Sequence, residues 1–177
     1  VANEVFIDSA TLRENVVALA RNIGYTPRSR KAARATVSFF VDTSNITPNP
    51  VSITLKKGPV AATSGTFGRQ SFIFSILDDI TVPVFDGIAS FDDIPIYEGS
   101  LLSTNFTFSS RNPFQRFTLP NSGVDTSLIS VTVKANEEST QSVKHTLQEN
   151  LFSVKSDSKI YYLQEIEDER YELLFGD

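Results

Sequence analysis

The 177-residue sequence contains no cysteine, no methionine and no tryptophan, and its only histidine is His145. Without cysteine, the chain has no disulfide, no thiolate metal ligand and no thiol nucleophile. A single histidine cannot complete a histidine-rich metal site, and no Gly-x-Ser-x-Gly motif accompanies it. We therefore expect no catalytic residues, no metal site and no cofactor.

Long hydrophobic runs are also missing. No stretch approaches the roughly 18 apolar residues of a membrane-spanning helix, so we expect no membrane partner. No basic–apolar–small signal segment opens the sequence either. Because the chain begins at Val1 and has no methionine, we interpret it as a piece of a longer protein.

Hydroxyl and phenyl side chains are abundant, with 21 serines, 16 threonines and 14 phenylalanines. This composition is typical of β-strands. The net charge is −5, and it is distributed unevenly. Residues 1–69 carry nine basic and four acidic side chains, whereas residues 70–177 carry seven basic and seventeen acidic ones. A chain with one positive and one negative part can pair with copies of itself or with partners.

The apolar spacing predicts one helix, over residues 8–24. Apolar residues at intervals of four, three and four form one helical face: Leu12, Val16, Leu19 and Ile23. Asp8 or Ser9 can cap the start of this helix, and Gly24 its end. An amphipathic helix needs a surface to cover, so we expect this face to dock on a neighbouring surface.

From residue 35 onward the apolar period changes to two, which is typical of strands. We predict strands near residues 36–41, 51–55, 71–77, 80–84, 88–91, 94–97, 101–108, 115–119, 128–133, 160–166 and 170–175. The expected fold is mainly β, with antiparallel β-sandwich-like modules preceded by one amphipathic N-terminal helix. The expected divisions are a helix and basic linker at 1–34, a β-sandwich-like domain at 35–119, and a second, truncated β segment at 120–177.

Two charged clusters are candidate interface residues. The basic cluster consists of Arg28, Arg30, Lys31 and Arg34, and the acidic cluster consists of Glu165, Glu167, Asp168 and Glu169. The basic cluster lacks interleaved aromatic residues apart from Tyr25, and the protein is acidic, so we expect no nucleic-acid partner. We hypothesise that the basic cluster meets an acidic surface, on another copy or on a partner. The alternative is that the clusters are a solvated linker and a hairpin tip that blunts edge pairing.

Two pairs of carboxylates, Asp78-Asp79 and Asp92-Asp93, are the remaining candidates for chemistry. Paired carboxylates serve as acid and base in glycoside hydrolysis, and carboxylates also bind calcium. However, adjacent residues of an extended chain point to opposite faces, and both pairs stand beside turn signals. A small hydrolase therefore remains a weaker alternative, and we expect the protein not to be an enzyme.

Several segments in order carry a family resemblance. They are residues 12–29, residues 32–37, the strand at 51–58 with residues 72–74, Ile94 to Gly99, Asn112 to Phe117, and Gln164 to Asp177. In this order they resemble the baseplate J-like family, and more closely the wedge proteins of T4-like contractile-tailed phages. The resemblance spans nearly the whole chain, and its specificity lies in the ordered set rather than in any one motif.

The resemblance implies a structural role without catalytic residues. Such a wedge protein joins wedges around the tail tube, binds other baseplate proteins, and forms a dimer or ring in the full-length protein. It implies a location in the virion, at the tail baseplate, after assembly in the bacterial host cytoplasm. The alternative is a secreted or surface β-sandwich module that binds carbohydrate or a cell surface. The lack of tryptophan counts against stacking on sugars, although five tyrosines are present.

Overall fold

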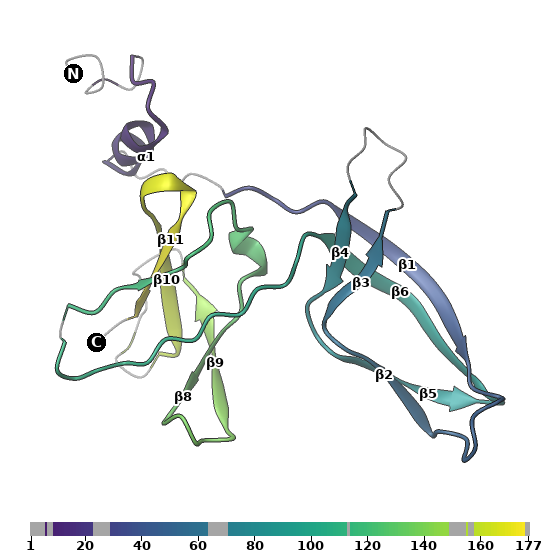
Figure 1. Ribbon diagram of the computed structural model, residues 1–177. Helices are drawn as coiled ribbons and strands as arrows, with labels where there is room; N and C mark the ends of the chain where they lie inside the picture. Colours follow the sequence, from purple (N-terminus) through teal and green to yellow (C-terminus); the bar gives the residue numbers. More distant parts are fainter. Residues whose placement is uncertain are drawn as a thin grey trace. The chain divides into compact units, whose positions relative to one another are not determined.

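The computed structural model describes residues 6, 9–22, 29–63, 71–112, 114–148, 155 and 158–175. The expected mainly β fold is confirmed, with two sheets and one short N-terminal helix. The chain divides into two compact units (Figure 1). Unit 1 combines Val1–Lys31 with Thr104–Asp177, and unit 2 is Ala32–Ser103.

This division differs from the expected one at 34 and 119. The N-terminal helix is not a separate segment, because it belongs to the same unit as the C-terminal sheet. Residues 104–119, which were expected in the first β domain, also belong to unit 1. Unit 2 is thus an insertion in the sequence of unit 1. Contacts between segments far apart in the sequence join these parts, among them the pairing of Thr118 with Glu172 and the Arg–Glu pairs described below. Sequence periodicity does not register such contacts.

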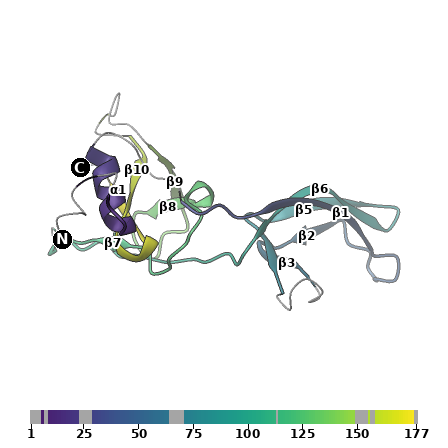
Figure 2. The same ribbon diagram turned by 90° about the horizontal axis from the view of Figure 1, so that it is seen from above.

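Unit 2 consists of six strands, and the long strand β6 (Ile88–Glu98) is the central one. Strand β1 (Arg34–Asp42) pairs with β6 along nearly its whole length, and the two lie side by side in both views (Figures 1 and 2). On the other edge of β6, β5 (Ile80–Phe85) pairs with its beginning and β4 (Ile73–Ile76) with its end. Strand β2 (Ser52–Leu55) pairs with β5, and β3 (Gly58–Ala62) with β4. All six strands contribute apolar side chains to one core.

A β-bulge in β6 keeps its apolar side chains inside unit 2. Ala89 and Phe91 are buried, but the next buried residue is Ile94, three positions after Phe91. The two residues between them, Asp92-Asp93, stand opposite the single residue Ser38 of β1. The sequence predicted two short strands, 88–91 and 94–97, on either side of this pair. The structure instead has one strand, because the extra residue resets the alternation without ending the pairing.

Unit 1 contains a five-stranded sheet in the order β7-β11-β10-β9-β8. The strands are β7 (Phe117–Thr118), β8 (Val131–Lys134), β9 (Ser142–Leu147), β10 (Ile160–Glu165) and β11 (Tyr171–Phe175). The pairs are antiparallel except β9 with β10, which run parallel, a departure from the expected arrangement. Val131, Tyr161 and Leu173 form the centre of a core separate from that of unit 2. The strand predicted at 101–108 is absent, and these residues are exposed.

The helix of unit 1, α1, runs over Arg13–Asn22 and begins later than the predicted residue 8. The Ser9 and Ala10 amides both donate to the Phe6 carbonyl, so a turn precedes the helix. At ten residues, α1 is well below the length of a membrane-spanning helix. Within the part of the chain that the structure describes, no helix is long and apolar enough to cross a membrane.

Candidate functional site

The acidic hairpin (residues 160–175) is formed by β10, the 3₁₀ turn Glu167–Glu169 and β11. Strand alternation distributes its carboxylates. Glu165 pairs in register with Tyr171 on one face of the hairpin, and Gln164 pairs with Glu172 on the opposite face. Asp168 and Glu169 have positive φ values of 59° and 54°, which let the chain reverse within the turn. The hairpin thus presents carboxylates on both faces and at its tip.

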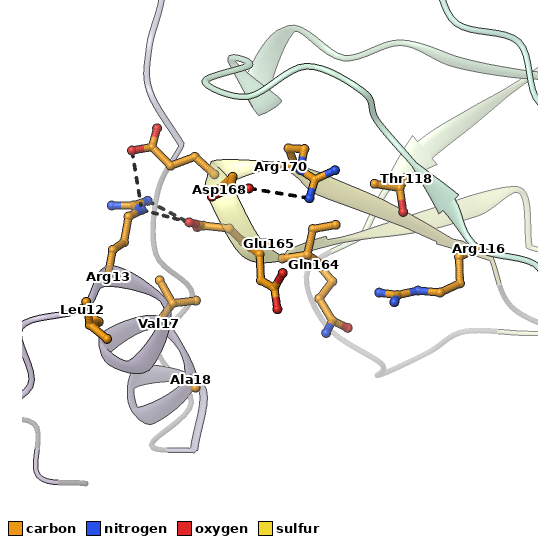
Figure 3. Close-up of a pocket in the computed structure, with 13 residues that line it drawn as sticks. Leu12, Arg13, Val17, Ala18, Arg116, Thr118, Gln164, Glu165, Asp168 and Arg170 are labelled. Atoms are coloured by element: carbon orange, nitrogen blue, oxygen red, sulfur yellow. Dashed lines mark hydrogen bonds and ion pairs between the residues drawn. The ribbon is translucent and has the colours of Figure 1, made fainter. Parts of the chain in front are cut away.

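Arg13 of α1 binds Glu165 with two hydrogen bonds. Its Nε donates to Glu165 Oε1 at 2.9 Å, and its Nη2 donates to Oε2 at 3.3 Å (Figure 3). The Arg13 Nε also lies 4.0 Å from Glu169 Oε1. The Glu165 side chain is only 7% exposed, so its charge needs this partner. The ion pair therefore fixes the first turn of α1 to the end of β10.

Arg30 binds Glu169 in the same two-pronged way. Its Nε donates to Oε2 at 2.8 Å, and its Nη2 donates to Oε1 at 3.2 Å. Beside it, the Thr126 amide and hydroxyl both lie within hydrogen-bond distance of Ser29 Oγ, at 3.0 and 2.9 Å. These contacts hold the end of the N-terminal segment of unit 1 against the hairpin turn and the 3₁₀ turn at Thr126–Leu128.

Arg116 binds Glu172 from the segment that precedes β7. Both contacts, Nε to Oε1 and Nη2 to Oε2, measure 2.6 Å. Thr118 stands opposite Glu172 in the β7–β11 pairing, and Arg116 is two positions earlier. Strand alternation therefore brings Arg116 to the same face as Glu172. The Glu172 side chain is 6% exposed, whereas Arg116 is largely in solvent.

These pairs shift the pKa values of the hairpin. Arg30 lowers the pKa of Glu169, and Arg116 lowers the pKa of Glu172 against the opposing effect of burial. Burial raises the pKa of the Tyr171 phenol, and the neighbouring Glu165 adds to this rise. The carboxylates of Glu169 and Glu172 therefore stay ionised at neutral pH, as ion-pair partners rather than as proton donors.

A groove of about 830 Å³ runs between α1 and the acidic hairpin (Figure 3). It is lined by Leu12, Arg13, Val17, Ala18, Arg116, Thr118 and residues 164–170. Most of its charged side chains are engaged in ion pairs. Even Arg170, at its rim, lies 3.8 Å from Asp168 Oδ2. Among the described residues, no group of three or more histidine, aspartate or glutamate side chains could hold a metal ion.

The predicted helical face is rotated from the one that α1 buries. Val17 and Ala20 are the buried residues of α1, Val16 and Leu19 are half-buried, and Leu12 is exposed. The prediction followed the spacing of the larger apolar side chains. The stripe that is buried in the structure is instead centred on Val17 and Ala20. Ile23, the last predicted residue of the face, lies outside the described residues.

The predicted basic cluster is divided between the two units. Arg30 pairs with Glu169 inside unit 1, and Lys31 is exposed. Arg34 lies on β1 of unit 2, with its guanidinium carbon 5.8 Å from the centre of the Tyr97 ring. Arg28 lies outside the described residues. In the acidic cluster, Glu165 and Glu169 pair with Arg13 and Arg30, Asp168 is exposed and lies near Arg170, and Glu167 is exposed.

Sequence reasoning missed two participants in these pairs: Arg13 and Arg116. Glu172 belongs to the same acidic stretch as Glu165 and Glu169. Arg13 lies outside the predicted apolar face, and its partner Glu165 is 152 positions away. Arg116 carries no local signal, since its partner is 56 positions away.

The other residues considered for chemistry have structural contacts. The His145 ring packs edge-on to Phe175, with ring centres 5.9 Å apart. Asp79 accepts from Lys56 Nζ and from the Lys57 amide, both at 2.8 Å. The Asp93 amide donates to Ser38 Oγ at 2.9 Å in the β6 bulge. The His145–Phe175 contact spans β10, whereas the Asp79 and Asp93 contacts stabilise a turn and the bulge.

No protein-family model matches the chain, and no curated protein matches it. Its function has to be inferred from its own residues.

Proposed function

We propose that the chain is a structural component of a contractile phage tail baseplate, a wedge protein that joins wedges and binds other baseplate proteins without catalysing a reaction. The observation that carries this proposal is the set of three two-pronged Arg–Glu pairs on the acidic hairpin. Through them, Arg13, Arg30 and Arg116 tie three separate segments to one hairpin. The charges of the site thus fix chain segments to one another, which is compatible with a structural role.

The physical character of these pairs supports a role in an assembly that rearranges. Each pair joins a shielded glutamate to an arginine that is at least half exposed. Such contacts are directional and strong when paired, yet salt and competing charges weaken them. A contractile baseplate must hold one arrangement and then adopt another. Polar, charge-complementary contacts exchange partners more readily than a large apolar seam.

The family resemblance described above supports the same role and supplies its context. It implies other baseplate proteins as partners, a homodimer or ring, and a place in the virion after assembly in the bacterial host cytoplasm. For contacts between chains we propose Lys31 and Arg34 as the residues that meet an acidic surface. Arg30 is not available for this purpose, because Glu169 of the same chain engages it.

Immunogold labelling tests the proposed location. An antibody raised against the chain is applied to tailed particles purified from the source that encodes it. We expect gold at the end of the tail away from the head. Label confined to secreted material or to a cell surface contradicts the proposal. It would favour the carbohydrate-binding or surface-binding module, which a glycan array then tests directly.

Light scattering coupled to size-exclusion chromatography tests the proposed contact. We expect the chain to associate at low salt and to dissociate at high salt. The variant Lys31→Glu/Arg34→Glu should stay monomeric at low salt. The matched control Lys134→Glu/Lys144→Glu changes the charge equally on the exposed β8–β9 hairpin and should associate normally. Equal association of both variants would contradict the role of Lys31 and Arg34.

A further inference from the structure

Three large apolar side chains lie together on the outer face of the unit 2 sheet: Phe40 of β1, Phe85 of β5 and Ile88 of β6. Phe85 stands directly opposite Ile88. Ile88 stands opposite Asp42 on its other side, and Phe40 is two positions before Asp42 on the same face. The side chains of Phe40, Phe85 and Ile88 are 68%, 73% and 46% exposed. We call these three residues the Phe40 patch.

The core does not require this patch. The alternate residues of the same strands, Val41, Val84 and Ala89, face the core of unit 2 and complete it. Exposed apolar area costs free energy in water relative to a buried position. Single exposed apolar residues are common, but a contiguous group on one sheet face is typical of a protein-binding surface.

Three carboxylates surround the patch. Asp42 lies beside Ile88 on the same face. Asp86 lies in the turn between Phe85 and Ile88, and Asp92 continues the outer face beyond Ser90, whose hydroxyl lies 3.4 Å from Asp92 Oδ1. All three aspartates are exposed. The stretches that build this end of the sheet, residues 35–55 and 80–97, contain no lysine and no arginine. The rim of the patch is therefore purely acidic.

The backbone beneath the patch is held in place before any partner binds. Thr43, which is fully buried, donates to the Gly87 carbonyl through both its amide, at 2.7 Å, and its hydroxyl, at 2.8 Å. These bonds fix the loop after β1 to the β5–β6 turn. On the core side, the Phe39 and Phe91 rings stack with centres 5.0 Å apart. A preformed surface loses little conformational entropy on binding.

We infer that the Phe40 patch docks a partner protein whose contact surface has apolar side chains flanked by lysine or arginine. The apolar centre supplies affinity by excluding water, and the acidic rim selects a basic partner. The same acidic rim disfavours binding of other kinds of partner. It repels nucleic-acid phosphates and anionic lipid headgroups, and it repels the identical face of a second copy. The inference stands apart from the proposed function, since it does not depend on a phage role.

A peptide titration of the full chain tests this inference. The probe is a synthetic peptide in which leucine and phenylalanine alternate with lysine, and a matched peptide carries glutamate in place of lysine. Binding is followed through the amide resonances of the ¹⁵N-labelled protein. We expect the lysine peptide to shift the resonances of Phe40, Phe85, Ile88 and their neighbours, and to bind more weakly as salt increases. The glutamate peptide should not bind.

Variants separate the two parts of the contact. Phe40→Ser/Phe85→Ser should weaken the lysine peptide about tenfold or more. Ile73→Ser is the matched control, because Ile73 is exposed to a similar extent as Ile88 but lies on β4, away from the patch.

The variant Asp86→Asn/Asp92→Asn leaves the apolar centre intact. It should also weaken binding of the lysine peptide and reduce the dependence of this binding on salt. Its control, Asp78→Asn/Glu98→Gln, removes two carboxylates elsewhere in unit 2 and should bind normally.

The same measurements can overturn the inference. Failure of the lysine peptide to bind the unaltered chain overturns it. If the lysine peptide binds the Phe40→Ser/Phe85→Ser and Ile73→Ser variants equally well, its binding site is not the Phe40 patch, and the inference is overturned too. If only the aspartate variant loses affinity, the contact is a purely electrostatic one without an apolar centre. If sedimentation shows self-association that the Phe40/Phe85 variant abolishes, the occupant is a second copy and not a basic partner.

Discussion

Arg30 and Glu169 are 139 positions apart in the sequence, yet Arg30 Nε lies 2.8 Å from Glu169 Oε2. Arg30 stands one residue before the N-terminal part of unit 1 ends at Lys31. The pair therefore anchors the chain just before it continues into unit 2. The Arg30 side chain also lies over Gly123, where an added Cβ would be 3.4 Å from Arg30 Cδ. The positive and negative parts of this chain thus meet within unit 1 at this point.

The Arg13–Glu165 pair should stabilise unit 1. Arg13→Met keeps the length of the side chain but leaves the shielded Glu165 carboxylate without its arginine. We expect a loss of about 1–3 kcal/mol in the free energy of unfolding of unit 1. Urea unfolding followed by near-ultraviolet circular dichroism measures it, because Tyr161, Tyr162 and Tyr171 report on the unit 1 sheet.

Arg111→Met is the matched control, since Arg111 is exposed in the same unit. It should leave the midpoint of urea unfolding nearly unchanged. The double variant Arg13→Met/Glu165→Gln should recover part of the loss, because a neutral glutamine is easier to shield from water than a carboxylate that has lost its arginine. If Arg13→Met and Arg111→Met behave alike, α1 is not held by this pair.

The stability of unit 1 should fall in acid. The pKa values of Glu169 and Glu172 in the folded chain lie below their ordinary value of 4.5. For a lowered pKa, the stabilisation is fully present above the unfolded value and is lost as the pH falls through the folded value. We therefore expect a constant urea midpoint between about pH 7 and pH 5, and a decline below about pH 4.5.

The variant Glu172→Gln separates this effect from general acid unfolding. Glutamine does not titrate, so part of the decline below pH 4.5 should disappear, at the cost of lower stability at pH 7. Glu138→Gln, at an exposed position between β8 and β9, should leave the pH profile unchanged. An identical pH profile for Glu172→Gln and the unaltered chain would show that this ion pair does not control acid stability.

The strands were largely predictable because alternation and residue type are local properties of the sequence. Residues 80–84 show apolar and polar side chains in turn, residues 36–41 and 160–166 are rich in β-branched and aromatic side chains, and each range overlaps a strand of the structure. The stretch 101–108 shows the same alternation but forms no strand. A strand also requires a neighbour to accept its backbone hydrogen bonds, and none of the described strands pairs with this stretch. Alternation is thus not sufficient for such a prediction.

The site was predictable only in part, for a related reason. The acidic cluster and Arg30 were recognised from local charge density, and their complementarity was anticipated. The contact itself was expected between chains or with a partner, because net charge does not say which charges meet. Arg116 was missed, since its position depends on the pairing of β7 with β11. The unit boundaries at Lys31 and Thr104 followed from the same long-range contacts and had no local signal.

The β6 bulge should make unit 2 sensitive to the residue at position 93. Asp93 has a φ of 53°, a left-handed conformation that β-branched residues disfavour. We expect Asp93→Val to reduce the free energy of unfolding by about 1–2 kcal/mol, and Asp93→Gly to be nearly neutral. Asp92→Val is the matched control in the same bulge, and at this exposed position it should change stability by less than about 0.5 kcal/mol. Thermal unfolding compares the three variants, and equal losses for Asp92→Val and Asp93→Val would argue against strain at position 93.

Unit 2 should fold when separated from unit 1. Its two ends are held together, because the Glu98 amide donates to the Ala33 carbonyl at 2.8 Å and Arg34 pairs in register with Tyr97. Its core draws on all six of its strands and on no residue of unit 1. We expect a polypeptide of residues 32–103 to show a cooperative thermal transition and well-dispersed amide resonances.

A polypeptide of residues 35–119 is the comparison. It adds Arg116 and Phe117 without their partners on β11, and it lacks Ala33. It should therefore be no more stable than 32–103, and greater stability of 35–119 would contradict the boundaries at Lys31 and Thr104.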